Sequence, residues 1–253
     1  AVATGKLTPG KVILEPTSGN TGIGMAIVGA AMGFKVKLTM PACVSTERRA
    51  VLQALGAELE LTPGCDKTDG AIRRAHDIIS NDGIVYYMPN QFDNPQNYLA
   101  HYHTTGPEIY SQTSGDVDVF VAGMGTTGTL MGCSMFLKEK KPSIKVIGIE
   151  PVMNHRIQGL KNMKEAIVPK IYDPNKLDRI ISCSDEDAFE TTRDLAIHEG
   201  LFCGISSGAA MWAAIEAARD LPRGSTVAVI FPDRGDRYLS TEVFRSFCAM
   251  CPP

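Results

Sequence analysis

The chain has 253 residues, and 25 Lys and Arg against 28 Asp and Glu give it a formal net charge of −3, so nothing favours nucleic acid or an anionic membrane as a partner. Its 44% hydrophobic and 21% charged residues are typical of a globular protein of one large or two smaller domains, and no apolar run approaches the ~20 residues of a membrane span. Its seven cysteines are scattered and odd in number, which favours reduced thiols in a cytoplasm over a disulfide framework.

Strand-like and helix-like segments alternate along the chain. The expected strands are residues 11–16, 35–41, 57–62, 83–88, 116–125, 144–151 and 225–232. The expected helices are residues 21–32, 46–55, 68–80, 95–112, 127–139, 185–198, 208–220 and 237–247. Ser45 and Ser184 are expected N-caps, and Gly33 and Gly200 are expected helix ends. Alternating β and α units predict an α/β protein with parallel sheets covered by helices.

A polar, proline-containing stretch, FDNPQNY at 92–98, marks the expected change of domain. We therefore expect an N-terminal α/β domain at residues 1–95 and a C-terminal α/β domain at residues 96–253. The chain begins with alanine, and its first expected strand begins at residue 11. This beginning predicts a fragment or a processed chain.

Ligands of parallel sheets bind at the carboxyl ends of the strands, which directs attention to the loops 16–22, 122–129 and 231–237. In VFVAGMGTTGTLMG (119–132) a strand runs into three glycines and three threonines before a helix begins. Backbone N–H groups at a helix start favour a phosphate, and the threonine hydroxyls add donors. A tight strand–helix turn without a ligand is the plainer alternative.

The same loop allows a second reading. Gly123, Gly125 and Gly128 match the spacing of a dinucleotide fingerprint, and Glu150 lies at the end of the next strand. The crowding of threonines favours a single small phosphate group, but the loop alone does not separate the two ligands. A nucleoside triphosphate is not expected, because the loop has no Walker lysine.

The stretch LEPTSGNTGIGMAIVG (14–29) has a second polar loop at a helix start. Thr17, Ser18, Asn20 and Thr21 offer hydroxyl and amide groups, which suits a carboxylate with a neighbouring oxygen. A simple N-cap by serine or threonine is the alternative.

A third stretch, EGLFCGISSGAAMWAA (199–214), places Ser206 between Gly204 and Gly208. This spacing matches a hydrolase nucleophile elbow only superficially, because no clear strand precedes it.

Together these loops resemble those of the cysteine synthase family of pyridoxal-phosphate enzymes, which have the fold type II, tryptophan-synthase-β-like architecture. The matching stretches lie between residues 5 and 245 and are EPTSGNTGIGMAI, MPACVSTERRAVLQALGAEL, QFDNPQNYLAHYHTTGPEIY, GMGTTGTLMG, EGLFCGISSGAA and DRGDRYLST. GTTGT and DRGDRYLST look more like cysteine synthase B than the A type. The resemblance implies two three-layer parallel-sheet domains and pyridoxal 5′-phosphate as cofactor.

The resemblance also implies roles for individual residues. The substrate α-carboxylate would be bound by the loop Thr17, Ser18, Gly19, Asn20 and Thr21. Asn20 would also hydrogen-bond the cofactor ring oxygen, and Gln91 resembles a glutamine near the substrate. The phosphate cup would be Gly125, Thr126, Thr127, Gly128 and Thr129. The family's A type has glycine where Thr127 stands, so the threonine loses backbone freedom and adds a hydroxyl.

Ser206 looks like the partner of the pyridine nitrogen. A carboxylate there would keep the nitrogen protonated and the ring a deep electron sink, whereas a neutral hydroxyl does not. A weaker sink suits expulsion of a β-substituent over transamination.

The family's Schiff-base lysine stands about 25 or more residues before the Thr17 loop, in a Ser-x-x-Lys-like segment. Only 16 residues precede Thr17 here, and Lys6 and Lys11 are too close to the loop. We therefore expect either a sequence that lacks its N-terminal segment, with an incomplete first domain, or a catalytically disabled relative. No catalytic residue is assigned.

The implied reaction is a β-replacement that makes L-cysteine from O-acetylserine or O-phosphoserine and a sulfur donor. The alternatives are a cystathionine β-synthase, a serine/threonine dehydratase, a non-catalytic relative that binds the cofactor or an acyltransferase tail, and, as an outsider, a dinucleotide oxidoreductase. We expect a cytoplasmic homodimer, a possible serine acetyltransferase tail as partner, no nucleic acid, no membrane and no metal. Cys248 and Cys251 form a CxxC that lacks two further zinc ligands nearby, and His101 and His103 are expected at surface or packing positions.

Overall fold

The computed structural model describes residues 1–244, and its internal contacts divide the chain into two units, Ala1–Gln91 and Phe92–Pro253. Each unit has its own four-stranded sheet, and every strand pair in both sheets is parallel. The α/β class with two parallel sheets is thus confirmed. The sequence interpretation placed the domain change after residue 95. Cys248 and Cys251 lie outside the described residues.

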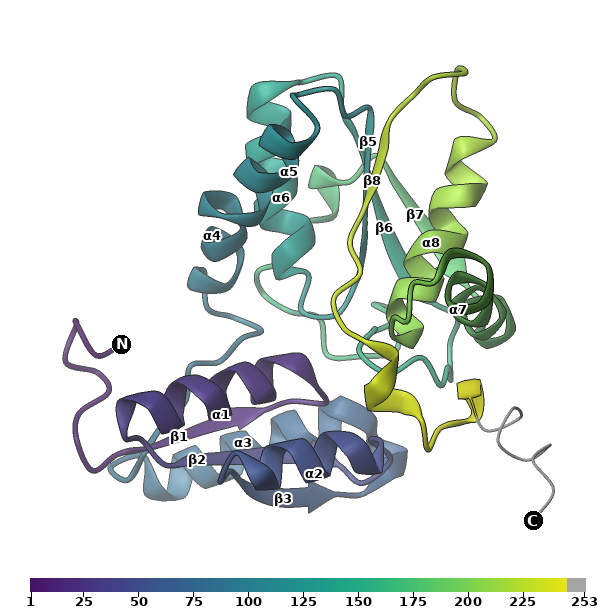
Figure 1. Ribbon diagram of the computed structural model, residues 1–253. Helices are drawn as coiled ribbons and strands as arrows, with labels where there is room; N and C mark the ends of the chain where they lie inside the picture. Colours follow the sequence, from purple (N-terminus) through teal and green to yellow (C-terminus); the bar gives the residue numbers. More distant parts are fainter. Residues whose placement is uncertain (245–253) are drawn as a thin grey trace, which may run out of the picture. The chain divides into compact units, whose positions relative to one another are not determined.

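In the first unit the strand order is β3-β2-β1-β4, and Figure 1 labels the first three of these strands. The strands are β1 Val12–Pro16, β2 Val36–Pro41, β3 Glu58–Thr62 and β4 Tyr86–Tyr87. The helices are α1 Asn20–Met32, α2 Thr46–Ala54, the short 3₁₀ turn η1 Gly64–Asp66 and α3 Lys67–Asp82. Successive side chains of β1 pack into two different apolar cores. Ile13 packs with residues of α1 and α2, and Leu14 packs with residues of α3. The strand is therefore buried on both faces, as parallel strands usually are.

In the second unit the strand order is β7-β6-β5-β8 (Figure 1). The strands are β5 Val119–Gly123, β6 Lys145–Pro151, β7 Arg179–Cys183 and β8 Val227–Val229. The helices are α4 Gln96–His103, α5 Thr105–Gln112, α6 Gly128–Lys140, α7 Asp185–Glu199 and α8 Ile205–Ala218, with 3₁₀ turns η2 Pro174–Lys176 and η3 Gly235–Tyr238.

The sheet of the second unit separates two apolar cores. Val119 and Val121 of β5 face the core shared with α7 and α8. Phe120 and Ala122 face the core shared with α6. Figure 1 accordingly shows α4, α5 and α6 on one side of this sheet and α7 and α8 on the other.

Asp118 fixes the start of β5 against its neighbours. Its Oδ2 accepts the backbone N–H of Thr226 at 3.0 Å, just before β8, and its Oδ1 accepts Nζ of Lys141 at 2.8 Å. Its backbone carbonyl accepts the N–H of Lys145, where β6 begins, at 2.8 Å. The bonds from Lys141 and Thr226 hold the pKa of the Asp118 carboxyl below its usual value. One aspartate therefore ties three strands at one end of the sheet.

Several local predictions are confirmed. Ser184 caps α7 by accepting the N–H of Asp187 at 3.1 Å, and Gly33 and Gly200 end their helices in the left-handed region at φ 75° and 67°. Ser45 stands at the N-cap position of α2 without a side-chain capping bond. None of the helices within residues 1–244 combines the length and the apolar character that crossing a bilayer requires.

Other local predictions are wrong. The single helix expected over residues 95–112 is two helices, because Pro107 has no N–H to donate to the carbonyl of His103 and the chain breaks at Thr104. The strand β7 was not expected, and α8 begins at Ile205 rather than Gly208. Of the helix expected over residues 237–247, the first two residues lie in η3, residues 242–244 are helical, and the last three residues lie outside the described part.

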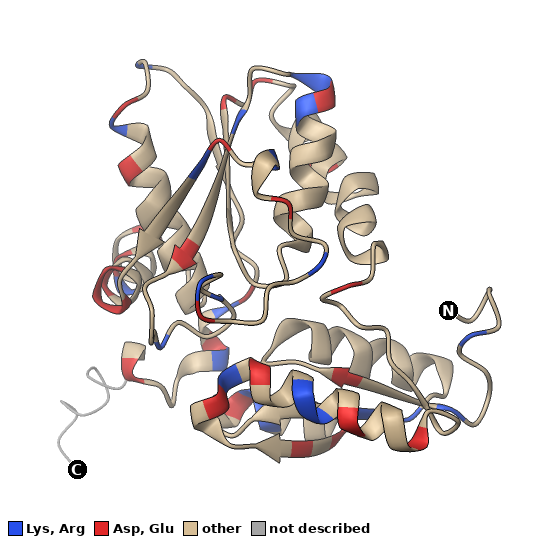
Figure 2. Cartoon of the chain, turned by 180° about the vertical axis from the view of Figure 1, so that it is seen from behind, with Lys and Arg blue, Asp and Glu red and all other residues tan. Residues whose placement is uncertain are grey.

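Charged side chains of both signs are interspersed. Along α3 basic and acidic residues follow one another, as Figure 2 shows. Lys37 of β2 bridges Glu58 and Glu60 of β3 at 2.9 and 3.0 Å. These pairs align the edge strand of the first sheet with its neighbour.

Candidate active site

The turn from β5 into α6 forms a small cup in the second unit. Gly123 ends the strand, Thr127 is the N-cap of α6, and the first helical residue is Gly128. The first backbone N–H groups of a helix have no partner within the helix. The cup therefore offers donors at the positive end of α6, where an anion is favoured.

Thr127 is the most unusual residue of this cup. Its backbone has φ 68°, a left-handed conformation that is an outlier for a β-branched residue and costs about 1–3 kcal/mol. Its side chain is 2% exposed, and its Oγ1 has no hydrogen-bond partner among the described residues. An unpaired buried hydroxyl costs about 1–3 kcal/mol. Both costs fit a ligand that supplies the missing acceptor.

Helix α4 braces the other two threonines of the cup. Asn97 donates from Nδ2 to Oγ1 of Thr126 at 3.0 Å, and Nε2 of His101 lies 3.2 Å from Oγ1 of Thr129. Nδ1 of His101 lies 2.9 Å from Oγ1 of Thr105, and burial lowers the pKa of the ring. A neutral imidazole has one donor and one acceptor nitrogen, so it can orient both hydroxyls. The sequence interpretation assigned His101 a surface or packing position and missed this link.

The loop between β6 and η2, residues 152–173, lies against both the cup and Ser206. The N–H of Lys161 donates to the carbonyl of Met124 at 2.7 Å. A Cβ on Gly125 would lie 2.6 Å from the carbonyl oxygen of Gly159, and a Cβ on Gly159 would lie 4.0 Å from Oγ of Ser206. Ser206 itself is buried in the first turn of α8. The structure therefore brings Gly125 and Ser206 to the same loop, although they are far apart in the sequence.

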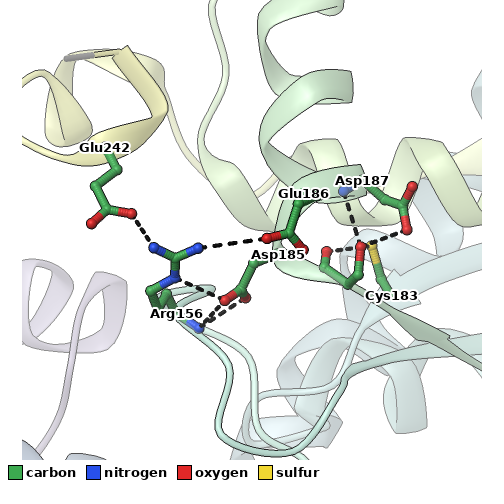
Figure 3. Close-up of polar contacts among 7 residues, drawn as sticks. Arg156, Cys183, Asp185, Glu186, Asp187 and Glu242 are labelled. Atoms are coloured by element: carbon green, nitrogen blue, oxygen red, sulfur yellow. Dashed lines mark hydrogen bonds and ion pairs between the residues drawn. The ribbon is translucent and has the colours of Figure 1, made fainter. Parts of the chain in front are cut away.

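Arg156 holds this loop to the start of α7 (Figure 3). Its backbone N–H donates to both carboxylate oxygens of Asp185 at 2.8 and 3.1 Å, and its Nε donates to Oδ2 at 3.0 Å. Its guanidinium also pairs with Glu242 and lies 3.8 Å from Glu186. The Asp185 carboxylate is thus held by two N–H groups of one residue, which fixes the loop three residues before Gly159.

The second polar loop lies in the first unit, between β1 and α1. Thr17 donates its N–H to the carbonyl of Thr39 at 2.9 Å, and its Oγ1 accepts the N–H of Gly19 at 3.1 Å. The N-cap of α1 is Gly19, and no side chain caps this helix. The simple N-cap alternative is therefore wrong, and the hydroxyls of Ser18 and Thr21 do not serve as caps. Asn20 is the first residue of α1 and is exposed.

Arg48 of α2 contacts the backbone of this loop from the protein interior. It is 1% exposed, and its Nη1 donates to the carbonyl oxygen of Ser18 at 2.8 Å. A Cβ on Gly19 would lie 3.2 Å from the guanidinium carbon, so a side chain there would require the guanidinium to shift by a few tenths of an ångström. The sequence interpretation missed Arg48. Its spacing of four from the buried Leu52 was the available signal, because residues four apart share a helix face.

Glu15 and Gln91 are joined at the start of the same loop. The fully buried Glu15 accepts the backbone N–H of Asn90 on Oε2 and that of Gln91 on Oε1, both at 2.8 Å. Gln91 also donates from Nε2 to the carbonyl of Pro16 at 2.6 Å. Burial raises the pKa of the Glu15 carboxyl to about 7, against the opposing effect of the two N–H bonds. Gln91 is thereby held beside the residues that lead into Thr17.

Comparison with known proteins identifies the family. Residues 1–233 match the family model described as "Pyridoxal-phosphate dependent enzyme". The chain belongs to this family. Pyridoxal phosphate is therefore its cofactor, and the family and the cofactor expected from the sequence are confirmed.

Within this family, the chain is similar to proteins named cysteine synthase. The chain is 44% identical over 248 residues to a cysteine synthase of Aquifex aeolicus, covering 96% of this chain and 76% of the relative. It is 44% identical over 251 residues to a cysteine synthase of Staphylococcus aureus, covering 95% and 79%. These matches confirm the resemblance to cysteine synthases.

Two solved structures share the fold type II architecture. An O-acetylserine sulfhydrylase isoform 3 from Entamoeba histolytica has a TM-score of 0.87 and 38% identity, covering 97% of this chain and 75% of that one. An O-acetylserine-dependent cystathionine β-synthase from Helicobacter pylori has a TM-score of 0.90 and 39% identity, covering 96% and 81%. The fold type expected from the sequence is confirmed.

Proposed function

We propose that this protein makes L-cysteine by a pyridoxal-phosphate-dependent β-replacement, from an activated serine and a sulfur donor. The strained, buried Thr127 with its unpaired hydroxyl carries the proposal, because a phosphate ester supplies the acceptor that this hydroxyl lacks. Relatives named cysteine synthase and O-acetylserine sulfhydrylase support O-acetylserine as the activated serine. O-phosphoserine is the second candidate, and cystathionine or dehydratase chemistry is less favoured.

In this proposal the cup binds the cofactor phosphate. The backbone N–H groups at the start of α6 and the hydroxyls donate to phosphate oxygens. The proposed phosphate-binding residues are Gly125, Thr126, Thr127, Gly128 and Thr129. Asn97 and His101 hold two of these hydroxyls in place. The bound cofactor supplies an electron sink for the electron pair released when the substrate α-carbon loses its proton.

Ser206 is proposed as the partner of the cofactor's ring nitrogen. It lies in the first turn of α8 and is 5% exposed, so its hydroxyl is shielded from water. A neutral hydroxyl does not impose a proton on that nitrogen, whereas a carboxylate does. The sink is weaker as a result, which favours loss of a β-substituent over transamination.

The loop of the first unit is proposed to bind the amino-acid substrate. The N-terminus of α1 and the hydroxyls of Ser18 and Thr21 would receive the α-carboxylate, together with Thr17 and Gly19. The buried cation of Arg48 beneath the loop adds attraction for an anion. Asn20 is proposed to bind the cofactor's ring oxygen, and Gln91 to contact the substrate. No described residue is assigned as the base at the α-carbon.

We further propose a cytoplasmic homodimer. Support for the dimer comes from α1, where Ile27, Val28 and Met32 are each more than half exposed and form an apolar face. Support for a cytoplasmic site comes from the five described cysteines, which are all free. We also propose a serine acetyltransferase tail as a partner, because its terminal carboxylate would suit the same N–H groups as the substrate.

Two threonine variants and two ligands test the cofactor site. Thr127→Val removes the hydroxyl and keeps the branched side chain, and Thr127→Ser keeps the hydroxyl. Loss of one bond to a charged phosphate predicts roughly 10- to 100-fold weaker binding of pyridoxal phosphate by Thr127→Val, measured through Trp212 fluorescence, with little change for Thr127→Ser.

Pyridoxal, which has no phosphate, is the matched control ligand and should bind both variants and the parent equally. An equal loss for both ligands would refute the role of Thr127 at the phosphate. Production of cysteine from O-acetylserine and sulfide by the full-length protein tests the reaction itself, and its absence would refute the proposed function.

A further inference from the structure

Two exposed thiols lie in neighbouring loops of the first unit. Three of the five described cysteines are buried, namely Cys133, Cys183 and Cys203. The other two, Cys43 and Cys65, are exposed. Cys43 lies between β2 and α2, and Cys65 lies in η1 after β3.

The register of the sheet brings these two loops together. Pro41 at the end of β2 pairs with Thr62 at the end of β3, and the next N–H, that of Ala42, donates to the carbonyl of Thr62 at 2.9 Å. The segments that follow β2 and β3 are therefore still adjacent where they leave the sheet. Cys43 follows two residues after its paired strand end, and Cys65 follows three residues after its own.

The side chain of Cys43 already touches the residue before Cys65. Its Sγ lies 3.6 Å from the carbonyl oxygen of Gly64, and a Cβ on Gly64 would lie 3.2 Å from the Cβ of Cys43. The carbonyl carbon of Gly64 is bonded to the nitrogen of Cys65. One peptide unit therefore separates the contacted oxygen from the Cα of Cys65.

A disulfide would close through rotation of the Cys65 side chain and adjustment of the short turn η1. A disulfide requires Cβ atoms about 3.5–4.5 Å apart. The thiol of Cys65 has only a 3.8 Å contact with Oδ1 of Asp66, and its side chain is exposed, so it is able to turn about χ1. The buried residues Val44 and Thr62 anchor the two loops and need not move.

We propose that Cys43 and Cys65 are a site of reversible oxidation that forms an intramolecular disulfide with a low-molecular-weight disulfide such as oxidised glutathione as the oxidant. One thiolate attacks the glutathione disulfide, so that a mixed disulfide forms and one glutathione thiolate leaves. The second cysteine thiolate then attacks the protein sulfur of the mixed disulfide, and the second glutathione leaves. The two cysteines lose two electrons and two protons, and these end on the two glutathione thiols.

This disulfide would enclose α2 and β3 in one covalent loop. The enclosed segment includes Arg48, which holds the carbonyl of Ser18. The inference does not depend on the proposed reaction, because neither cysteine is among the residues assigned to cofactor or substrate.

The test treats the folded full-length protein with oxidised glutathione, blocks the remaining thiols and maps tryptic peptides by mass spectrometry. We expect peptide 38–48, with Cys43, joined to peptide 50–67, with Cys65, at a mass two hydrogens below the sum of the two. Reduction with dithiothreitol should separate them. Cys43→Ser and Cys65→Ser should each abolish the joined peptides and leave a stable glutathione adduct on the remaining cysteine.

Two outcomes would overturn the inference. One is that both cysteines of the parent carry separate glutathione adducts at every exposure. The other is that both remain free while an unfolded sample reacts. Cys133→Ser is the matched control, since this thiol is buried and its removal should leave the joined peptides unchanged.

Discussion

Replacing Glu15 by glutamine should remove a large part of the pH dependence of stability. The Glu15 carboxyl is fully buried, and its pKa is raised from 4.5 to about 7 in the folded chain. The folded state therefore binds this proton more tightly than the unfolded state does. The resulting stabilisation is fully present below pH 4.5 and is lost as the pH rises through 7.

The size of the effect follows from the shift. About 2.5 pKa units correspond to about 3 kcal/mol in the free energy of unfolding. No correction for solvent screening applies, because the side chain is not exposed. A glutamine side chain does not titrate, so the Glu15→Gln variant should lose this dependence. The new side chain also presents an NH₂ group to one of the N–H donors of Asn90 and Gln91, which costs about 1–3 kcal/mol at every pH.

Urea unfolding followed by far-UV circular dichroism at pH 5, 6, 7 and 8 measures how the free energy of unfolding depends on pH. From pH 5 to 8 the parent should lose about 2–3 kcal/mol more than Glu15→Gln loses, because part of the effect is already lost between pH 4.5 and 5. The exposed Glu190→Gln serves as control and should follow the parent. If the parent and Glu15→Gln curves ran parallel, Glu15 would be ionised throughout this range and the reasoning from burial would be wrong.

Three further variants probe other parts of the site. Arg48→Met should leave the Ser18 carbonyl without its donor and lower the free energy of unfolding by about 1–3 kcal/mol. It should also raise the KM for the amino-acid substrate more than it lowers kcat. An unchanged KM would contradict the proposed role of the Arg48 cation. Gly125→Ala places a Cβ against the Gly159 carbonyl and should abolish tight binding of pyridoxal phosphate at unchanged far-UV circular dichroism, whereas retained binding would show that the loop moves freely. Asp185→Asn should weaken the hold on Arg156 and lower Tm by several degrees, with Glu186→Gln, which loses only a 3.8 Å exposed pair, as the control that should not change Tm.

Features governed by a few neighbouring residues were predictable from the sequence. The cap at Ser184 and the helix ends at Gly33 and Gly200 depend on local hydrogen bonds and on backbone freedom. The break at Thr104 was also readable, because Pro107 lies inside the expected helix. The edge strand β7 gave too weak a signal, with five residues and a charged residue at its start.

The supporting residues of the site were not predicted, for a different reason. Glu15 and Arg48 are polar residues in the core, and only the fold shows which backbone groups they satisfy. Only part of the behaviour of Thr127 was predictable from the sequence. Its loss of backbone freedom followed from the glycine that the family's A type has at this position, whereas its unpaired hydroxyl is shown only by the three-dimensional structure. The loops themselves were found because their residue types are unusual at strand ends.

The anchoring of β5 by Asp118 has a consequence for ligand binding at the other end of the strand. Both faces of β5 are apolar, so polarity alone does not prevent a slip by one residue. Such a slip would carry Gly125 about 3.3 Å along the sheet, further than a hydrogen bond tolerates. Asp118 thus fixes, from the opposite end of β5, the position of the cup that we propose binds the cofactor phosphate, without itself contacting that cup.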